Sequence, residues 1–232
     1  MRILFLRAGR SPAFPEAGAL TPDESGLVAL GGELTPELVV EAYSKGVFPW
    51  DGTSPVPWFS PDPRMVLAPG EFHASRSLTR LARKARFEIT IDKAFRDVIW
   101  RCANTRRNKQ HGTWINGDIM PVYLALHAQG VAHSVEVWDH QGVLVGGLYG
   151  LALGHIFFGE SMFSSAPNSS KLALQHLCRR LEQWGFHLLD CQQDTPHLRT
   201  LGARTIPRAE FLSKLERALT AGEAWGGGAE EV

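Results

Sequence analysis

One segment of about fifty residues limits the folds open to this chain more than any other. Residues 143–151 and 156–163 are apolar runs separated by a turn at Gly154, and a helical pattern at residues 169–184 leads to a third apolar run, residues 187–192. Short runs of this kind predict strands, whereas apolar residues at 3.6-residue spacing predict a helix. Because strand–helix–strand crossovers are right-handed, the third strand should lie parallel to the second. The segment therefore predicts an α/β protein with a mixed sheet.

Two carboxylates interrupt these apolar strands. Strand alternation places Glu160 on the same face as Phe158 and Met162, and Asp190 lies near the end of the last strand, two residues before Gln192. An ionised carboxylate beside large apolar groups needs a partner or a cationic substrate. Either acid alone is more often a buried acid satisfied by backbone donors or by an arginine. Two acids at the carboxyl ends of neighbouring parallel strands indicate instead a site that faces one cleft.

The rest of the chain predicts two domains. A length of 232 residues with 44% hydrophobic residues is enough for a large core. Residues 1–62 hold a short strand at Ile3–Leu6 and one helix between Thr35 and Gly46, joined by proline-rich loop, and we expect a small N-terminal domain. Residues 63–232 should form a larger second domain, with residues 222–232 as a disordered tail. Its further strands are expected at Met65–Leu67, Phe87–Ile91 and His133–Trp138, and its further helices near residues 75–85, 93–103, 117–129 and 207–220.

A net charge of zero conceals a basic segment. Residues 76–109 contain eleven Lys and Arg against three acidic residues, so this segment carries +8 and the remainder −8. Ser75 can cap a helix whose outer face carries four of these cations, Arg76, Arg80, Arg83 and Lys84, and whose buried stripe is formed by Leu78, Ala82 and Ala85. A solvated helix face is the common explanation of such a run. The absence of any acid in this helix favours a polyanion, for which a phosphate backbone is the natural candidate.

Several classes of protein are disfavoured. The three cysteines, Cys102, Cys178 and Cys191, have no CxxC spacing, so neither a disulfide framework nor a structural zinc site is indicated. The sequence holds no HExxH motif, and we expect neither a metal nor a cofactor. No apolar stretch approaches the length of a membrane span, and residues 1–10 lack a cleavage pattern. We therefore expect a cytoplasmic protein that does not act at a membrane, and a monomer.

A set of uncommon strings gives the chain a resemblance to a known family. From about residue 14 to residue 212, and in consistent order, it is similar to the leucyl/phenylalanyl-tRNA–protein transferases. The strings are GLVALGG at 26–32, AY at 42–43, GVFPW at 46–50, WFSPDPR at 58–64, TWI at 113–115, AHSVE at 132–136, LVGGLYG at 144–150, FGESMF at 158–163, DCQ at 190–192 and LGA at 201–203. Phe59, where the family pattern leads us to expect a tryptophan, and the residues after Trp50 depart from it.

The resemblance implies an activity and a fold. Such an enzyme transfers Leu, and less readily Phe or Met, from aminoacyl-tRNA to the α-amino group of proteins that begin with Arg or Lys. The transfer marks those proteins for degradation by the N-degron pathway. The resemblance also implies a small N-terminal domain followed by a domain like the GNAT (acetyltransferase) fold. No cofactor is implied, because the aminoacyl ester is already activated.

The chemistry suggests roles for the polar residues. An α-amino group with a pKa of about 8 is partly neutral near pH 7, so aminolysis needs placement more than a strong base. Asp190 suits hydrogen bonding to the attacking amine, either as a general base or as an anchor, and Gln192 can orient the ester or the amine. Glu160 offers charge complementarity to the cationic acceptor. We take these three residues as the catalytic candidates.

The resemblance also assigns the binding surfaces. It implies an apolar aminoacyl pocket formed by Leu148, Phe157, Met162, Leu177 and Leu189, although periodicity alone would make these residues core. It points to Trp50 and Trp114 as stacking partners of the terminal adenosine, and unpaired bases generally stack on aromatic rings. The basic helix would then hold tRNA phosphates without reading their sequence.

Two other classes of function compete with this interpretation. A coenzyme-A-dependent acyltransferase requires a glycine-rich loop that opens a helix, but Gly146, Gly147 and Gly150 lie within a predicted hairpin. A non-catalytic RNA-binding protein would account for the basic helix and the tryptophans, yet it gives no reason for Glu160 and Asp190 beside an apolar pocket.

Overall fold

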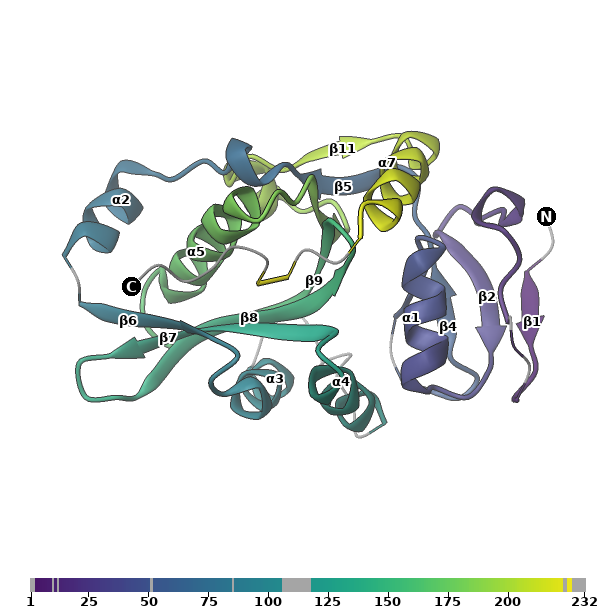
Figure 1. The fold of residues 1–232 in the computed structure, drawn as a ribbon, viewed down its shortest axis with the longest axis horizontal. Helices are drawn as coiled ribbons and strands as arrows, with labels where there is room; N and C mark the ends of the chain where they lie inside the picture. Colours follow the sequence, from purple (N-terminus) through teal and green to yellow (C-terminus); the bar gives the residue numbers. More distant parts are fainter. Residues whose placement is uncertain are drawn as a thin grey trace.

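Two β-sheets form the framework of the protein (Figure 1). The computed structural model describes residues 3–9, 11, 13–50, 52–84, 86–105, 118–222 and 225–226. The smaller sheet has four strands in the order β1-β2-β4-β3 and comes from the N-terminal part of the chain. Its strands are β1 (Leu4–Leu6), β2 (Leu27–Gly31), β3 (Phe48–Pro49) and β4 (Pro57–Phe59).

The larger sheet has seven strands in the order β11-β5-β10-β9-β8-β7-β6. These are β5 (Arg64–Leu67), β6 (Phe87–Ile91), β7 (Ala132–Asp139), β8 (Leu144–Leu153), β9 (Ile156–Ser164), β10 (Leu188–Gln192) and β11 (Arg204–Ile206). β10 runs parallel to β9, with Leu189 beside Phe157, whereas the other neighbours in this sheet are antiparallel. The predicted mixed sheet and parallel crossover are confirmed.

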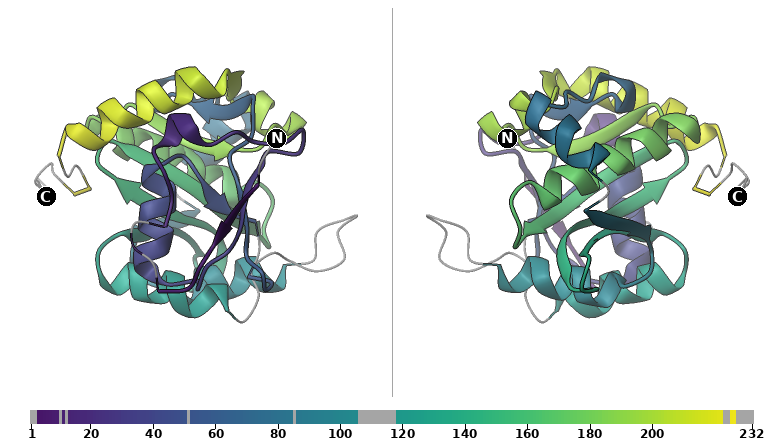
Figure 2. Two further views of the ribbon diagram at one scale, coloured as in Figure 1. Left: turned by 90° about the vertical axis from the view of Figure 1, so that its right-hand side faces the viewer. Right: turned by 90° about the vertical axis from the view of Figure 1, so that its left-hand side faces the viewer.

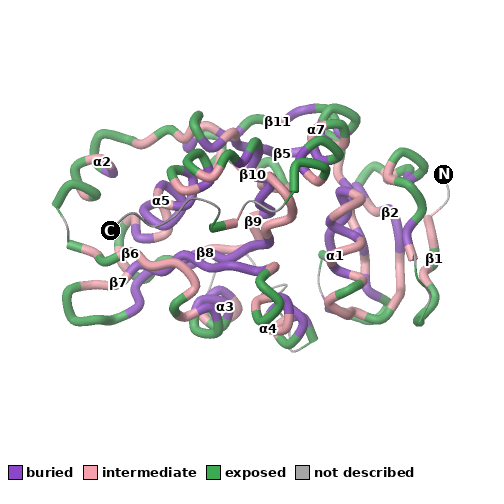
Figure 3. Tube along the Cα trace, in the orientation of Figure 1, coloured by how far each residue is buried: buried purple, intermediate pink, exposed green. Residues whose placement is uncertain are grey.

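Helices cover both faces of the larger sheet (Figures 1 and 2). The helical segments are η1 (Ala17–Ala19), α1 (Pro36–Ser44), η2 (Pro69–Glu71), α2 (Arg76–Arg83), α3 (Phe95–Asn104), α4 (Ile119–Ala128), α5 (Ser169–Gln183), α6 (Pro196–Thr200) and α7 (Arg208–Thr220). α5 packs on β7 and β8 from one side, and α3 and α4 pack from the other. The central strands are consequently buried along most of their length (Figure 3).

Two hydrophobic clusters fill the layers. One lies between α5 and the large sheet. The other lies on the opposite face and joins α3 and α4 to α1, α7 and the small sheet. The N-terminal strands therefore share a core with the large sheet, and the domain boundary expected at residue 62 stays a prediction. Within the described residues, no helix combines the length and the apolar character that crossing a lipid bilayer requires.

The structure corrects the N-terminal prediction. α1 begins after the Thr35 cap, with Pro36 in its first turn, as expected, and Thr35 Oγ1 accepts a hydrogen bond from the Leu38 N–H at 3.2 Å. The remainder is not loop, because β2, β3 and β4 pair there. β4 was missed because it is three residues long and begins at a proline, which is a frequent signal for loops.

A β-bulge at Glu160 overturns the predicted strand face. Tyr149 pairs with Ser161, and Gly150 pairs with Gly159, so Glu160 has no partner of its own on β8. An extra residue reverses the alternation of side chains beyond it. As a result Phe158 and Met162 belong to different hydrophobic clusters on opposite faces, and the prediction that they share a face with Glu160 is wrong.

Candidate active site

Glu160 receives three hydrogen bonds from three different parts of the chain. Its Oε1 accepts from the Tyr43 hydroxyl at 2.7 Å and from Gln192 Nε2 at 2.9 Å. Its Oε2 accepts from the Tyr123 hydroxyl at 3.1 Å, and the two tyrosine hydroxyls lie 2.9 Å apart. Tyr43 comes from α1, Tyr123 from α4 and Gln192 from the end of β10. The bulge thus points the carboxylate toward the junction between the N-terminal helix and the large sheet.

The protonation of this cluster is set by burial. Burial raises the pKa of Glu160 from its ordinary value of 4.5 to about 7, the tyrosine hydrogen bonds oppose that rise, and the charge of Asp190 adds to it. The pKa values of Tyr43 and Tyr123 are raised well above 10.0, first by burial and then by the charge of Glu160. Both phenols therefore remain hydrogen-bond donors near neutral pH, while Glu160 exchanges a proton there.

Both carboxylate oxygens of Asp190 accept hydrogen bonds from an arginine. Arg64 Nε donates to Asp190 Oδ1 at 2.9 Å and Arg64 Nη2 donates to Oδ2 at 2.6 Å, and both residues are completely buried. A bidentate, desolvated pair of this kind has a well-defined geometry. Neither carboxylate oxygen of Asp190 reaches the molecular surface in this structure.

Gln192 connects the two acids. Its backbone N–H donates to Asp190 Oδ1 at 2.9 Å, while its side-chain amide donates to Glu160. The register of β10 shifts between Asp190 and Gln192, and Gln192 has a φ of 62°, in the left-handed region. Side chains other than glycine seldom adopt that conformation unless their surroundings impose it. The acids expected to face one cleft are thus joined through Gln192.

Comparisons with known proteins decide the family. The chain matches the family model described as leucyl/phenylalanyl-tRNA protein transferase over residues 66–216, and the N-terminal domain model of that family over residues 32–62. It is 52% identical to the leucyl/phenylalanyl-tRNA–protein transferase of Nitrosospira multiformis, over 91% of this chain and 92% of that protein. It is also 52% identical to that of Syntrophotalea carbinolica, over 84% of this chain and 85% of that protein. The chain belongs to the leucyl/phenylalanyl-tRNA–protein transferase family.

Solved structures are less similar to this transferase than the two sequences above. A GCN5-related N-acetyltransferase from Kribbella flavida has a TM-score of 0.39 and 11% identity, covering 76% of this chain and 63% of that chain. The structure of L-PGS from Bacillus licheniformis has a TM-score of 0.37 and 10% identity, covering 70% of this chain and 50% of that chain.

The five residues expected to form the transferase's aminoacyl pocket lie together. All belong to the hydrophobic cluster between α5 and the large sheet. Leu148, Phe157, Leu177 and Leu189 are buried, whereas Met162 is only partly buried. Trp225 enters the same cluster from beyond α7, and its ring lies 5.6 Å from that of Phe157. Met162 is therefore the member of the set that an incoming side chain would meet first.

The expected adenosine site is described only in part. The Trp50 side chain is exposed at the end of β3, and its ring centroid lies 4.8 Å from that of Phe59 on β4. An exposed indole supported by a second ring is a suitable stacking surface. Trp114 lies outside the described residues, so its place relative to Trp50 stays a prediction.

The four predicted phosphate-binding cations are exposed on or beside α2. Arg76, Arg80, Arg83 and Lys84 all face solvent. Ser75 caps the helix as predicted, with its Oγ accepting from the Leu78 N–H at 3.2 Å. Leu78 is buried, but Ala82 is exposed, so the prediction that it belongs to a buried stripe is wrong, and Ala85 lies outside the described residues.

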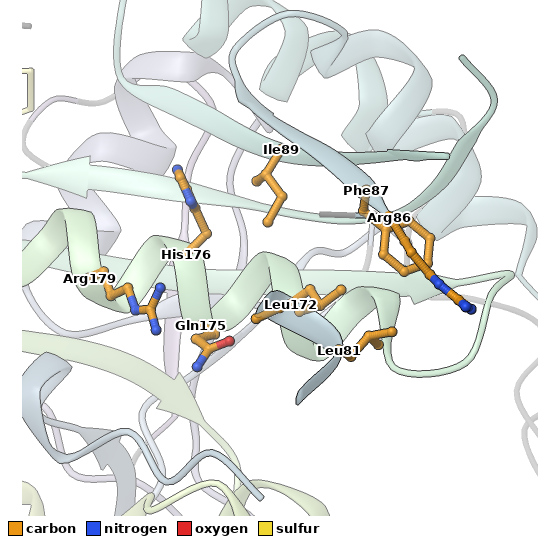
Figure 4. A pocket seen from close by; sticks show the side chains of 9 residues that line it. Leu81, Arg86, Phe87, Ile89, Leu172, Gln175, His176 and Arg179 are labelled. Atoms are coloured by element: carbon orange, nitrogen blue, oxygen red, sulfur yellow. The ribbon is translucent and has the colours of Figure 1, made fainter. Parts of the chain in front are cut away.

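Two further cations lie close to α2. A small pocket between α2, β6 and α5 has Arg86 and Arg179 at its rim (Figure 4). His176 also lines this pocket, and burial together with Arg180 and Arg179 lowers its pKa from 6.5 to about 4. The pocket contains none of the residues around Glu160, and its lining extends the basic surface of α2.

Sequence reasoning missed three residues of the site. Tyr43 and Tyr123 lie within apolar helical patterns, where a tyrosine is usually a core residue, and Arg64 lies in a proline-rich string. Tyr43 and Arg64 fall inside strings that carry the family resemblance, which was the one available signal for them. Tyr123 had no such signal.

Proposed function

We propose that this protein transfers an aminoacyl group, chiefly Leu and also Phe or Met, from tRNA to the α-amino group of proteins that begin with Arg or Lys. The observation that carries the proposal is the environment of Glu160, in a chain of this family. A carboxylate with a pKa of about 7, held by two phenols and an amide, can exchange a proton with an amine near neutral pH. We propose further that the enzyme acts as a cytoplasmic monomer and marks its acceptors for degradation.

Glu160 receives the proton of the acceptor in this proposal. The α-ammonium group of the acceptor binds beside Glu160 and transfers a proton to it, and the two pKa values differ by only about one unit. The neutral amine then attacks the ester carbonyl carbon. A C–N bond forms, the ester C–O bond breaks, and the second proton of the attacking nitrogen passes to the leaving ribose oxygen. The first proton leaves Glu160 for solvent and regenerates the carboxylate. A negative charge at this position also favours an acceptor with a cationic first residue.

Gln192 and Asp190 complete the reacting arrangement. The Gln192 amide lies within hydrogen-bonding distance of Glu160 and is suited to orienting the amine or the ester. Asp190 acts through Gln192 rather than through direct contact with substrate, because Arg64 and the Gln192 N–H occupy its oxygens. Asp190 is therefore proposed as a residue that positions Gln192, which differs from the direct hydrogen bond to the attacking amine expected from the sequence.

Substrate selection is divided between two surfaces. The apolar cluster of Leu148, Phe157, Met162, Leu177 and Leu189 would select the amino acid, and the flexible Met162 suits a pocket that accepts three side-chain shapes. The terminal adenosine would stack on Trp50 and Trp114, while the α2 cations bind backbone phosphates. Discrimination among tRNAs would then lie mainly in the amino acid that they carry.

The test is leucine transfer to two peptides. Labelled leucine on tRNA is offered to a peptide beginning with Arg and to one beginning with Ala, using the wild type, Glu160→Gln and, as a matched control, the exposed Glu182→Gln. We expect transfer to the Arg peptide, a loss of about 100-fold or more in Glu160→Gln, and no change in Glu182→Gln. Tight tRNA binding without transfer by the wild type would overturn the enzyme assignment and favour an RNA-binding protein.

A further inference from the structure

Arg64 contacts four parts of the molecule. Besides Asp190, its Nη1 donates to the Gly46 carbonyl oxygen at 3.2 Å. Its guanidinium carbon lies 4.7 Å from the centroid of the Phe48 ring and 4.5 Å from that of Phe211, so the cation is held between two aromatic faces. The side chain is fully buried, and each of these contacts uses a different part of the guanidinium group.

The contacts with Asp190, Gly46 and Phe48 each connect Arg64 to a residue that would meet a substrate. Asp190 accepts the Gln192 N–H, and Gln192 reaches Glu160. Gly46 follows α1, whose Tyr43 donates to Glu160. Phe48 begins β3, the strand that leads directly to Trp50, and it pairs with Phe59, whose ring supports the Trp50 indole. A single planar cation therefore joins the expected adenosine surface to the carboxylate cluster.

We infer that Arg64 is a positioning residue that couples the adenosine-binding strand β3 to Gln192 and Glu160. The inference rests on the proposed transfer reaction, because it supposes that Trp50 and Glu160 serve the two halves of one reaction. Arg64 touches neither substrate. Its planar group and fixed donors allow it to stack and to form a bidentate pair at once, which lysine cannot do. Seating the adenosine on β3 would thereby favour the productive geometry of Gln192.

The chain offers a matched control in Arg208. This second buried arginine lies at the same junction, where its Nε donates to Ser60 Oγ at 2.8 Å and its Nη2 to the Ala17 carbonyl oxygen at 3.1 Å. Among the described residues, its hydrogen bonds do not include one to Asp190. Substituting it disturbs the packing between α7 and the N-terminal part of the chain. It reaches Gly46 only through Ser60, whose Oγ donates to the Gly46 carbonyl oxygen at 3.0 Å, and it removes no contact that joins Phe48, Arg64, Asp190 and Gln192.

Double-mutant cycles on the intact enzyme test the coupling. Arg64→Lys is combined with Trp50→Ala and separately with Gln192→Ala, and kcat and KM are measured for leucyl-tRNA and for an Arg peptide. Residues that act as one unit give non-additive effects. We expect the loss of kcat/KM in each double variant to be smaller, by at least about fivefold, than the product of the losses in its two single variants. Arg208→Lys combined with the same two substitutions should be additive, at comparable thermal stability.

A second variant, Phe48→Leu, tests the inference if Arg64→Lys prevents the protein from folding. Phe48→Leu removes one aromatic face over Arg64 but leaves the ion pair with Asp190, and it should also be non-additive with Gln192→Ala. Additive behaviour in the Arg64 or Phe48 cycles, or equal non-additivity in the Arg208 cycles, would overturn the inference while leaving the transfer reaction intact. A wild type that transfers no leucine would instead overturn the proposed function.

Discussion

At the scale of single residues, Glu160 owes its properties to an irregularity in its strand. The bulge releases it from the alternation of β9, and the three donors around it come from segments 117, 37 and 32 positions away in the sequence. Tyrosine donors stabilise the charged carboxylate, while burial destabilises it by a larger amount, and the outcome is a pKa of about 7. An acid balanced in this way can change its charge at cellular pH.

The first prediction concerns the pH dependence of transfer. Because Glu160 accepts a proton only when ionised, kcat/KM for the Arg peptide, which reports the free enzyme, should rise with pH through an inflection near 7, the pKa of this acid. Glu160→Gln should abolish the inflection along with about 100-fold or more of the rate. Steady-state transfer measured across the neutral pH range checks both expectations. An inflection that survives in Glu160→Gln would assign the titration to another group.

The second prediction concerns Tyr43. Its hydrogen bond lowers the pKa of Glu160, so Tyr43→Phe should move the inflection of kcat/KM to higher pH. The same profile of rate against pH measures the shift, with Tyr149→Phe as a control, since no hydrogen bond from Tyr149 to Glu160 is among those described. A shift to lower pH would show that the Tyr43 hydroxyl does not stabilise the charged carboxylate.

At the scale of elements, the predictable parts are those with a strong repeating pattern. The unit from β8 through β9 and α5 to β10 could be predicted because strand and helix periodicities are long and end at Gly154 and Gly185. The bulge could not, because a bulge depends on which partner strand lies alongside, and that is set far away in the sequence. The same holds for the Arg64–Asp190 pair, and the three-residue β11 is too short for its pattern to mark it.

The third prediction concerns helix α2. Replacing Arg76, Arg80, Arg83 and Lys84 with Ala, one at a time, should weaken tRNA binding about equally for leucyl and phenylalanyl tRNA, since these cations contact phosphates. Each loss should also reduce the slope of log K against log salt by about one unit. Arg217→Ala on α7 is the control and should leave the slope unchanged. Filter binding at several salt concentrations measures it, and an unchanged slope in the α2 variants would remove this helix from the tRNA site.

At the scale of the whole molecule, the two faces of the large sheet hold different parts of the proposed site. The cluster under α5 holds the residues expected to bind the amino acid, and the opposite face packs against α1, which brings Tyr43 to Glu160. The residues expected to bind the amino acid come from the family resemblance, whereas strand and helix periodicity alone predicts only that they belong to the core. The sequence could not show that the N-terminal helix completes the carboxylate cluster, because that contact depends on how the small sheet docks.

The fourth prediction concerns Trp225. Its ring stacks on His133 at 3.9 Å and packs edge-on against Trp184 at 4.9 Å, which closes the cluster beneath α5. Trp225→Ala should lower the free energy of unfolding by on the order of 2 kcal/mol. The inflection of kcat/KM with pH should stay near 7, because Trp225 makes none of the contacts that set the pKa of Glu160. Denaturant unfolding provides the measurement, with the exposed Trp100→Ala as control. Equal stability of the two variants would contradict the closing role of Trp225.

The position of β5 in the large sheet has a consequence for protein synthesis. β5 lies between β10 and β11, and Arg64 is 126 positions from its partner Asp190. During translation Arg64 therefore leaves the ribosome long before Asp190 has been synthesised. β5 can pair only after both of its neighbours, β10 and β11, have been translated. The arrangement around Gln192 can form only after nearly all of the strands have been translated. Until synthesis is nearly complete, a nascent chain consequently lacks the arrangement around Gln192 that the proposed transfer reaction uses.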